Sequence, residues 1–128
     1  AQCVADQYAR YEVQPGLAVN GELTLGENIA DLGGLKMAHL AYRDWVKANG
    51  EEPKVAGLTG DQLLCVGFAQ GWCTVASDEV ERMRIATDPH SPPRFRVNGP
   101  VINYPAFAEA FDRAPGAPMA PKDVCEVW

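Results

Sequence analysis

Two carboxylates stand four residues apart in the stretch Gly26–Gly34, and no other pair in the chain is better placed to do chemistry. Glu27 and Asp31 would leave the same face of a helix, one turn apart. The rest of that face is small and apolar, so two like charges there need a cation opposite them. A metal ion, an arginine or histidines could supply it. Alternatively, Thr24-x-x-Glu27 is a capping box and Asp31 an exposed acid.

A proline-rich segment holds the candidate cations. Three prolines lie between Asp88 and Arg96. Because proline removes an amide donor, we expect residues 87–102 to be non-helical and this segment to be a stiff, extended loop. The loop would present His90 and Arg96 to developing negative charge or to a peptide carbonyl. The simpler alternatives are a loop histidine bonded to a carboxylate and a surface ion pair. His39 is expected to be structural or solvent-facing.

The elements that must position these residues are predicted to be mostly α-helical. We expect helices within 1–13, over 27–48 and 61–75, from 77 to 86 and from 103 onward, with loops at 15–26, 50–60 and beyond 114. Thr59-x-x-Gln62 fits a capping box. The helices 27–48 and 61–75 are apolar on most sides, which indicates that part of their covering comes from elsewhere. An isolated chain would therefore expose apolar patches and self-associate.

Composition narrows the function classes. The chain has 128 residues and a net charge of −6, with no block of like charge. This suits one globular domain and argues against a nucleic-acid partner. The sequence starts at Ala1, without a signal-peptide pattern, which favours a processed or truncated product.

Four cysteines leave the redox compartment open. Cys3 and Cys125 lie near the two ends, where a disulfide would imply an oxidising compartment; four buried thiols are the alternative. The sequence has no C-x-x-C pair and just two histidines, which argues against a zinc finger. It also has no H-E-x-x-H, so a metal bound by Glu27 would need ligands from outside this chain.

Four stretches, taken in order, match the motifs of one family. Residues 26–34 resemble the G-E-N-I-A-D-x-G-G signature of the neprilysin and endothelin-converting-enzyme family of zinc endopeptidases. Residues 68–73 resemble its F-A-Q-x-W-C, residues 88–96 its D-x-H-S-P-x-x-F-R, and residues 125–128 its C-x-V-W. The resemblance implies that residues 1–128 are the C-terminal, mostly helical part of a gluzincin-type, thermolysin-like catalytic domain. The upstream H-E-x-x-H region and the N-terminal helical region are absent.

The resemblance also implies a role for each matching residue. Glu27 would be the third zinc ligand, and Asp31 would orient a zinc-ligand histidine. His90 would stabilise the oxyanion, and Arg96 would contact a substrate backbone carbonyl. Hydrolysis would then use zinc with an upstream glutamate as general base.

The cysteines and one proline are compared with the same family. Its members pair cysteines like Cys3 and Cys125, so this disulfide is expected here. Cys73 lacks its usual partner, which lies in the missing part, and Cys65 is expected to be a buried free thiol. Pro93 replaces a common glycine and would stiffen the loop.

The sequence is therefore interpreted as a fragment of a zinc endopeptidase of small peptides that faces the extracellular, periplasmic or outer envelope side. Alone it is expected to be inactive and to bind zinc weakly or not at all. Its partners would be peptide substrates and the missing N-terminal portion. One rival is a non-catalytic helical binding module whose proline-rich loop recognises a partner. Another is a metal-free hydrolase that uses Glu27 and Asp31 as acid and base.

Overall fold

The computed structural model describes residues 1–127, and its elements confirm the prediction of a mostly helical chain. The helices are α1 (Gln2–Tyr8), α2 (Leu25–Asn49), α3 (Gly60–Gln70), α4 (Asp78–Thr87), α5 (Pro93–Ile102) and α6 (Pro105–Ala110). Two short antiparallel strands, β1 (Glu12–Gln14) and β2 (Leu17–Ala18), form a hairpin after α1.

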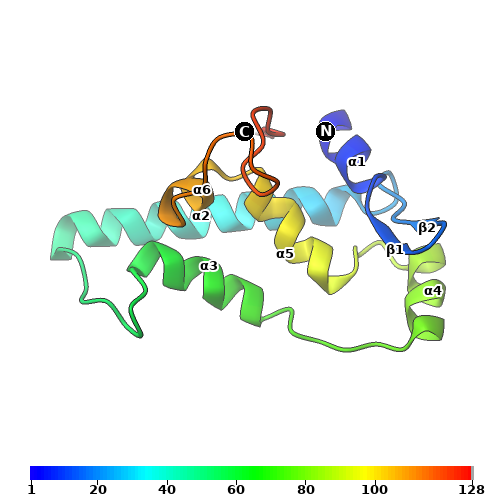
Figure 1. Cartoon of the computed structure of the whole chain (residues 1–128), viewed down its shortest axis with the longest axis horizontal. Helices are drawn as coiled ribbons and strands as arrows, with labels where there is room; N and C mark the ends of the chain where they lie inside the picture. Colours follow the sequence, from blue (N-terminus) through cyan, green and yellow to red (C-terminus); the bar gives the residue numbers. More distant parts are fainter. Residues whose placement is uncertain (128) are drawn as a thin grey trace.

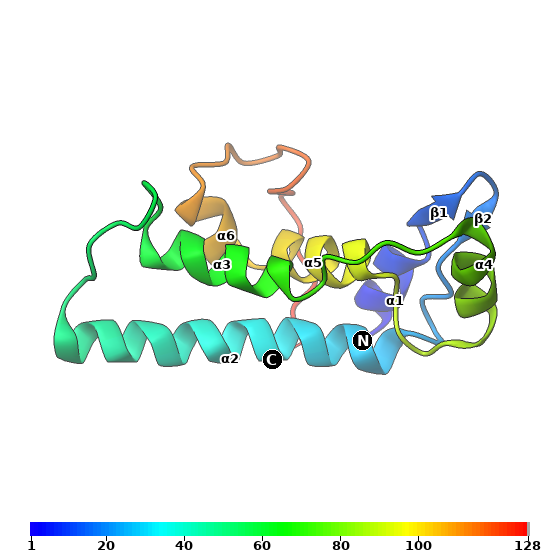
Figure 2. The ribbon, with the colours of Figure 1, turned by 90° about the horizontal axis from the view of Figure 1, so that it is seen from below.

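The long helix α2 is the axis of the molecule. Helices α3 and α5 lie along one side of it (Figures 1 and 2), and α1 packs near its N-terminal end. Gly50 ends α2 at a positive φ of 88°, and its amide donates to Val46 O. At the other end, the N-terminal turns of α2 face α5, where Arg96 donates to Asp31.

The core lies where α1, the hairpin and α5 meet. It contains Val4, Tyr8, Val19, Phe95 and Cys125. The Tyr8 hydroxyl donates to the carbonyl of Phe95 at 3.2 Å. This packing fixes the first turn of α5 against α1, because a buried donor left without a partner is costly.

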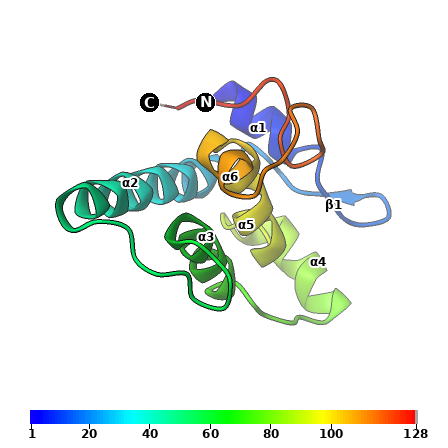
Figure 3. The same cartoon turned by 60° about the vertical axis from the view of Figure 1, so that its left-hand side comes forward.

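The two ends of the chain are joined covalently. Cys3 and Cys125 form the expected disulfide, with their Cα atoms 5.6 Å apart. Asn103 supports it, since Asn103 Oδ1 accepts from the Cys125 amide at 2.9 Å and Asn103 Nδ2 donates to Gln7. The N-terminal helix and the C-terminal segment consequently lie on the same side of the molecule (Figure 3).

Several predicted boundaries of helices and loops are wrong. The expected non-helical segment 87–102 contains α5, and the extended loop covers only residues 88–92. Pro93 is tolerated because the first helical amide has no intrahelical acceptor, so its loss costs nothing. Pro100 lies inside α5 and is fully buried. Burial of its apolar ring offsets the helical hydrogen bond that its missing N–H cannot make. The hairpin also replaces part of the expected helix 1–13 and loop 15–26.

The other helix ends largely follow the predicted signals. Thr59 and Gln62 form the expected capping box, and Ser77 caps α4 by accepting from the Val80 amide. Helix α3 ends at Gln70, five residues before the expected end at residue 75. Within residues 1–127, none of the helices combines the length and apolar character that a membrane crossing requires.

Candidate functional site

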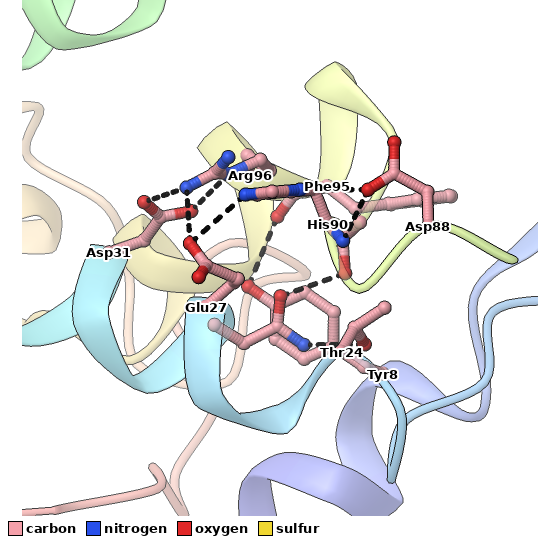
Figure 4. A network of polar contacts seen from close by, with 10 residues as sticks. Tyr8, Thr24, Glu27, Asp31, Asp88, His90, Phe95 and Arg96 are labelled. Atoms are coloured by element: carbon pink, nitrogen blue, oxygen red, sulfur yellow. Dashed lines mark hydrogen bonds and ion pairs between the residues drawn. The ribbon is translucent and has the colours of Figure 1, made fainter. Parts of the chain in front are cut away.

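The site begins at the N-terminal turns of α2. Thr24 is the N-cap residue, but its side chain makes no capping bond. Its hydroxyl instead donates to Asn20 O and accepts from Asn28 Nδ2. The capping-box alternative is therefore wrong, and Glu27 points toward α5 and the loop before it (Figure 4).

Arg96 is the cation that the two carboxylates require. Its Nε donates to Asp31 Oδ2 at 2.6 Å and its Nη2 to Asp31 Oδ1 at 2.7 Å. The side chains are 12% and 10% exposed, which excludes an ordinary surface ion pair. The guanidinium also lies over the Trp72 ring, 4.1 Å from its centroid. The hydrogen bonds to Asp31 raise the pKa of Arg96, so the guanidinium stays charged.

Glu27 is held more loosely than Asp31. Its Oε2 lies 3.6 Å from Arg96 Nη2 and 3.4 Å from His90 Nε2. These separations are long for hydrogen bonds, and the Glu27 side chain is 41% exposed. Glu27 is consequently the carboxylate that remains available to an incoming group.

His90 is oriented by Asp88. Asp88 Oδ1 accepts from the His90 amide at 2.9 Å and lies 2.7 Å from His90 Nδ1. The hydrogen bond from the His90 backbone amide, and then the one from the His90 ring, lower the pKa of Asp88, which stays a carboxylate. Because a carboxylate only accepts, Nδ1 carries the hydrogen and Nε2 is directed at Glu27 (Figure 4). The bond to a carboxylate matches the simpler interpretation of His90, although its other nitrogen faces the site.

The charged residues selected from the sequence lie together in the structure, whereas the neutral residues that support them were not anticipated. Glu27, Asp31, His90 and Arg96 converge with Asp88 nearby. Ser91 donates to Asn28 Oδ1 at 2.8 Å, a buried bond between α2 and the loop before α5. Both residues lie inside the matched motifs, but a motif does not indicate which neutral side chains bond to each other. Trp72 also lies inside a matched motif, which does not indicate its contact with Arg96.

His39 has the structural role that was one of its two expected outcomes. Its ring bridges α3 and the segment before α6, with Nε2 2.7 Å from Asp61 Oδ1 and Nδ1 2.5 Å from the Tyr104 hydroxyl. Its side chain is largely buried. His39 therefore belongs to the packing of α2, away from the site.

Two hollows border the site. A pocket of about 110 Å³ lies beside His90 and Arg96, with Trp72 and Ile85 in its wall. A larger hollow of about 330 Å³ lies between α2 and α3, and Asp31 is part of its lining; the other lining residues are Ala30, Gly34, Leu35, Ala38, Leu64 and Phe68. The small residues of the α2 face therefore border open space in this chain.

The donor set fits one ligand of a metal site. Within residues 1–127 no three His, Cys, Asp or Glu side chains cluster closely enough to hold a metal ion. Glu27 offers a carboxylate on the open side of the site, with its Oε2 3.4 Å from His90 Nε2. The chain can therefore contribute to a metal centre, with other ligands from elsewhere.

The comparisons with known proteins identify the class as zinc metallopeptidase. The model of peptidase family M13 matches residues 1–127, and the chain belongs to this family. It is 52% identical over 129 residues to endothelin-converting enzyme 1 of Cavia porcellus and 44% identical over 132 residues to neprilysin-1 of Caenorhabditis elegans. Each match covers 99% of this chain, but only 17% and 18% of the relative.

A solved structure shows the same fold. The open state of the zinc metalloprotease ZMP1 of Mycobacterium tuberculosis matches with a TM-score of 0.90 and 40% identity. The match covers 99% of this chain and 21% of that chain. The chain thus corresponds to about a fifth of its relatives, and the recognised resemblance to the neprilysin and endothelin-converting-enzyme family is confirmed.

Proposed function

We propose that this chain is the C-terminal part of a zinc endopeptidase that hydrolyses small peptides. The observation that carries the proposal is the convergence of Glu27, His90 and the Asp31–Arg96 pair on one open face. Family membership supports zinc and peptide-bond hydrolysis for the longer protein.

Each side chain has a role that its contacts support. Glu27 provides one zinc ligand from the start of α2. When bound, zinc polarises the scissile carbonyl and activates water. A carboxylate has about four lone-pair sites, so Asp31 can orient a ligand histidine while holding Arg96.

His90 and Arg96 act on the substrate. Asp88 keeps the His90 ring turned toward the site, where its protonated form stabilises the developing oxyanion. Arg96 uses two of its N–H groups on Asp31 and keeps others for a substrate backbone carbonyl. Both roles require donors that are held in place before the substrate arrives. The contact with Asp88 holds His90, and the contact with Asp31 holds Arg96.

The test is Glu27→Gln in the longer protein loaded with zinc. Mutation of a residue that only supports a metal ligand typically lowers metal affinity or activity about 10- to 100-fold. Loss of the ligand itself should therefore lower kcat/KM by more than about 100-fold. Glu22→Gln makes the same chemical change at an exposed residue five positions earlier and should leave activity unchanged. Peptide cleavage that survives Glu27→Gln would overturn the proposal.

The isolated chain should be inactive and bind zinc weakly, because it contributes one ligand. Its partners would be the N-terminal portion of the same protein and peptide substrates. The disulfide between Cys3 and Cys125 supports an extracellular, periplasmic or outer envelope location. Binding of a peptide without hydrolysis by the zinc-loaded longer protein would favour the helical binding module instead.

A further inference from the structure

The two sides of the site come from elements that are far apart in sequence. Glu27 belongs to the first turns of α2, and His90 to the loop between α4 and α5. Their direct contact is 3.4 Å long, and the side chains are 41% and 46% exposed. An exposed pair at that separation contributes little to holding its partners in one geometry. Something else must fix the loop against α2.

The residues immediately following Glu27 and His90 make the connection. Ser91 Oγ donates to Asn28 Oδ1 at 2.8 Å, across 63 positions of sequence. Asn28 is 1% exposed and Ser91 is 3% exposed. The bond is therefore shielded from water, which would compete for both groups at the surface.

A third residue fixes the orientation of the Asn28 amide. Asn28 Nδ2 donates to Thr24 Oγ1 at 2.9 Å, while the Thr24 hydroxyl donates to Asn20 O at 3.0 Å. Because the single hydroxyl hydrogen of Thr24 is committed to Asn20, Thr24 can only accept from Asn28. The amide oxygen of Asn28 must then face Ser91. The same arrangement uses the hydroxyl that would otherwise cap α2, and it leaves Glu27 free of the helix end.

We propose that Asn28 and Ser91 are positioning residues that set the distance between His90 and Glu27. They act through the backbone of their neighbours and do not touch the substrate. The inference rests on the proposed peptidase function for its effect on rate. Its geometric content, the position of His90 relative to α2, stands independently of activity.

The expected effect is on turnover. A displacement of about 1 Å at a catalytic group can cost on the order of 100-fold in rate. Ser91→Ala in the zinc-loaded longer protein should lower kcat about 10- to 100-fold with KM changed less than about threefold, because the lost interaction acts in the transition state. Ser91→Thr keeps the hydroxyl and should restore kcat to within a few-fold of the wild type. Thr24→Val releases the other end of Asn28 and should lower kcat in the same direction.

A matched control separates positioning from general loss of stability. Asn103→Ala removes another buried, hydrogen-bonded amide, between Gln7 and Cys125 and outside the site. It should lower the melting temperature as Ser91→Ala does, with kcat per folded molecule retained. Equal losses of kcat per folded molecule in Ser91→Ala and Asn103→Ala would overturn the proposal.

A second measurement needs no activity. In the 128-residue chain His90 is one of two histidines, so its ring signals are readily assigned by NMR. Nuclear Overhauser contacts between the His90 ring and the Glu27 side chain should be present in the wild type and Ser91→Thr, and lost in Ser91→Ala and Thr24→Val. Contacts that persist in Ser91→Ala would overturn the positioning role, whereas inactivity of the wild-type longer protein would count against the proposed function alone.

Discussion

Asp88 and His90 form a closed turn in which one carboxylate oxygen accepts from both the backbone and the ring of the same histidine. The hydrogen bond from the His90 amide, followed by the one from its ring, lowers the pKa of Asp88. A lowered folded-state pKa means that the stabilisation is present above the ordinary Asp value of about 3.9 and is lost as pH falls through the folded value. The orientation of His90 therefore depends on a carboxylate that stays charged at neutral pH.

We expect acidification below about pH 4 to loosen residues 88–92, because protonated Asp88 gives up its hold on His90. Amide hydrogen exchange or chemical shifts of His90, followed against pH in the 128-residue chain, would measure this loosening. Asp88→Asn should remove this acid transition, and Asp44→Asn, at an exposed site on α2, should retain it. An unchanged transition in Asp88→Asn would assign it to another group.

At this scale the charged residues were predictable and their neutral supports were not. Glu27 and Asp31 on one helix face require a cation, and Arg96 meets that requirement. The bond between Asn28 and Ser91 was not predictable, because a neutral polar side chain carries no charge that demands a partner. Its 63-residue separation is set by the fold alone.

At the scale of elements, α5 positions Arg96 because it lies tightly against α1. A Cβ atom built on Gly99 would lie 2.0 Å from the Tyr8 hydroxyl oxygen. The same Tyr8 hydroxyl donates to Phe95 O in the preceding turn of α5. Glycine is thus required at position 99 by the close approach of a buried side chain.

Gly99→Ala should lower the free energy of unfolding by about 1–3 kcal/mol, because the added methyl group forces α1 and α5 apart. Gly67→Ala is the matched control in α3, where an added Cβ meets no atom within 4 Å. That change should stabilise the chain by about 0.5–1 kcal/mol through helix propensity. Chemical denaturation measures both, and equal effects would contradict the packing argument.

The proline-rich segment shows the limit of reasoning at this scale. Proline excludes a residue from the interior of a helix but favours its first turn, and the sequence alone did not say which applied at Pro93. The cap signals at Thr59 and Ser77 were reliable because their partners lie within three residues. Thr24 has the same local pattern, but its hydroxyl donates to Asn20 O and accepts from Asn28 Nδ2, two competing partners four positions away on either side.

At the scale of the whole molecule, the disulfide closes nearly the entire chain into a loop. Cys3 and Cys125 are 122 positions apart, and cross-links that close long loops restrict the unfolded chain most. The double variant Cys3→Ser with Cys125→Ser should lose about 2–5 kcal/mol of stability. Cys73→Ser, at an exposed free thiol, should lose little. Equal denaturation midpoints for the two variants would contradict this role.

Exposed apolar residues on α2 predict self-association of the 128-residue chain. Met37, Leu40 and Trp45 are 69%, 54% and 45% exposed, and Met37 and Leu40, three positions apart, are neighbours on the helix surface. Sedimentation should show concentration-dependent dimers or larger species that Met37→Gln with Leu40→Gln reduces. Met83→Gln removes an apolar residue that is 60% exposed on α4 and serves as the control. A monodisperse monomer of the wild type would contradict the prediction.

The open face at Glu27 and His90 has an electrostatic consequence of its own. Both side chains are more than two-fifths exposed, so bulk water, with a dielectric constant near 80, weakens electrostatic interactions at this face. A polypeptide bound over this face would lower the effective dielectric constant there toward about 20, and each charge–charge energy would grow about fourfold. A polypeptide docked over this face would therefore strengthen contacts that already exist, and salt would screen them far less after docking.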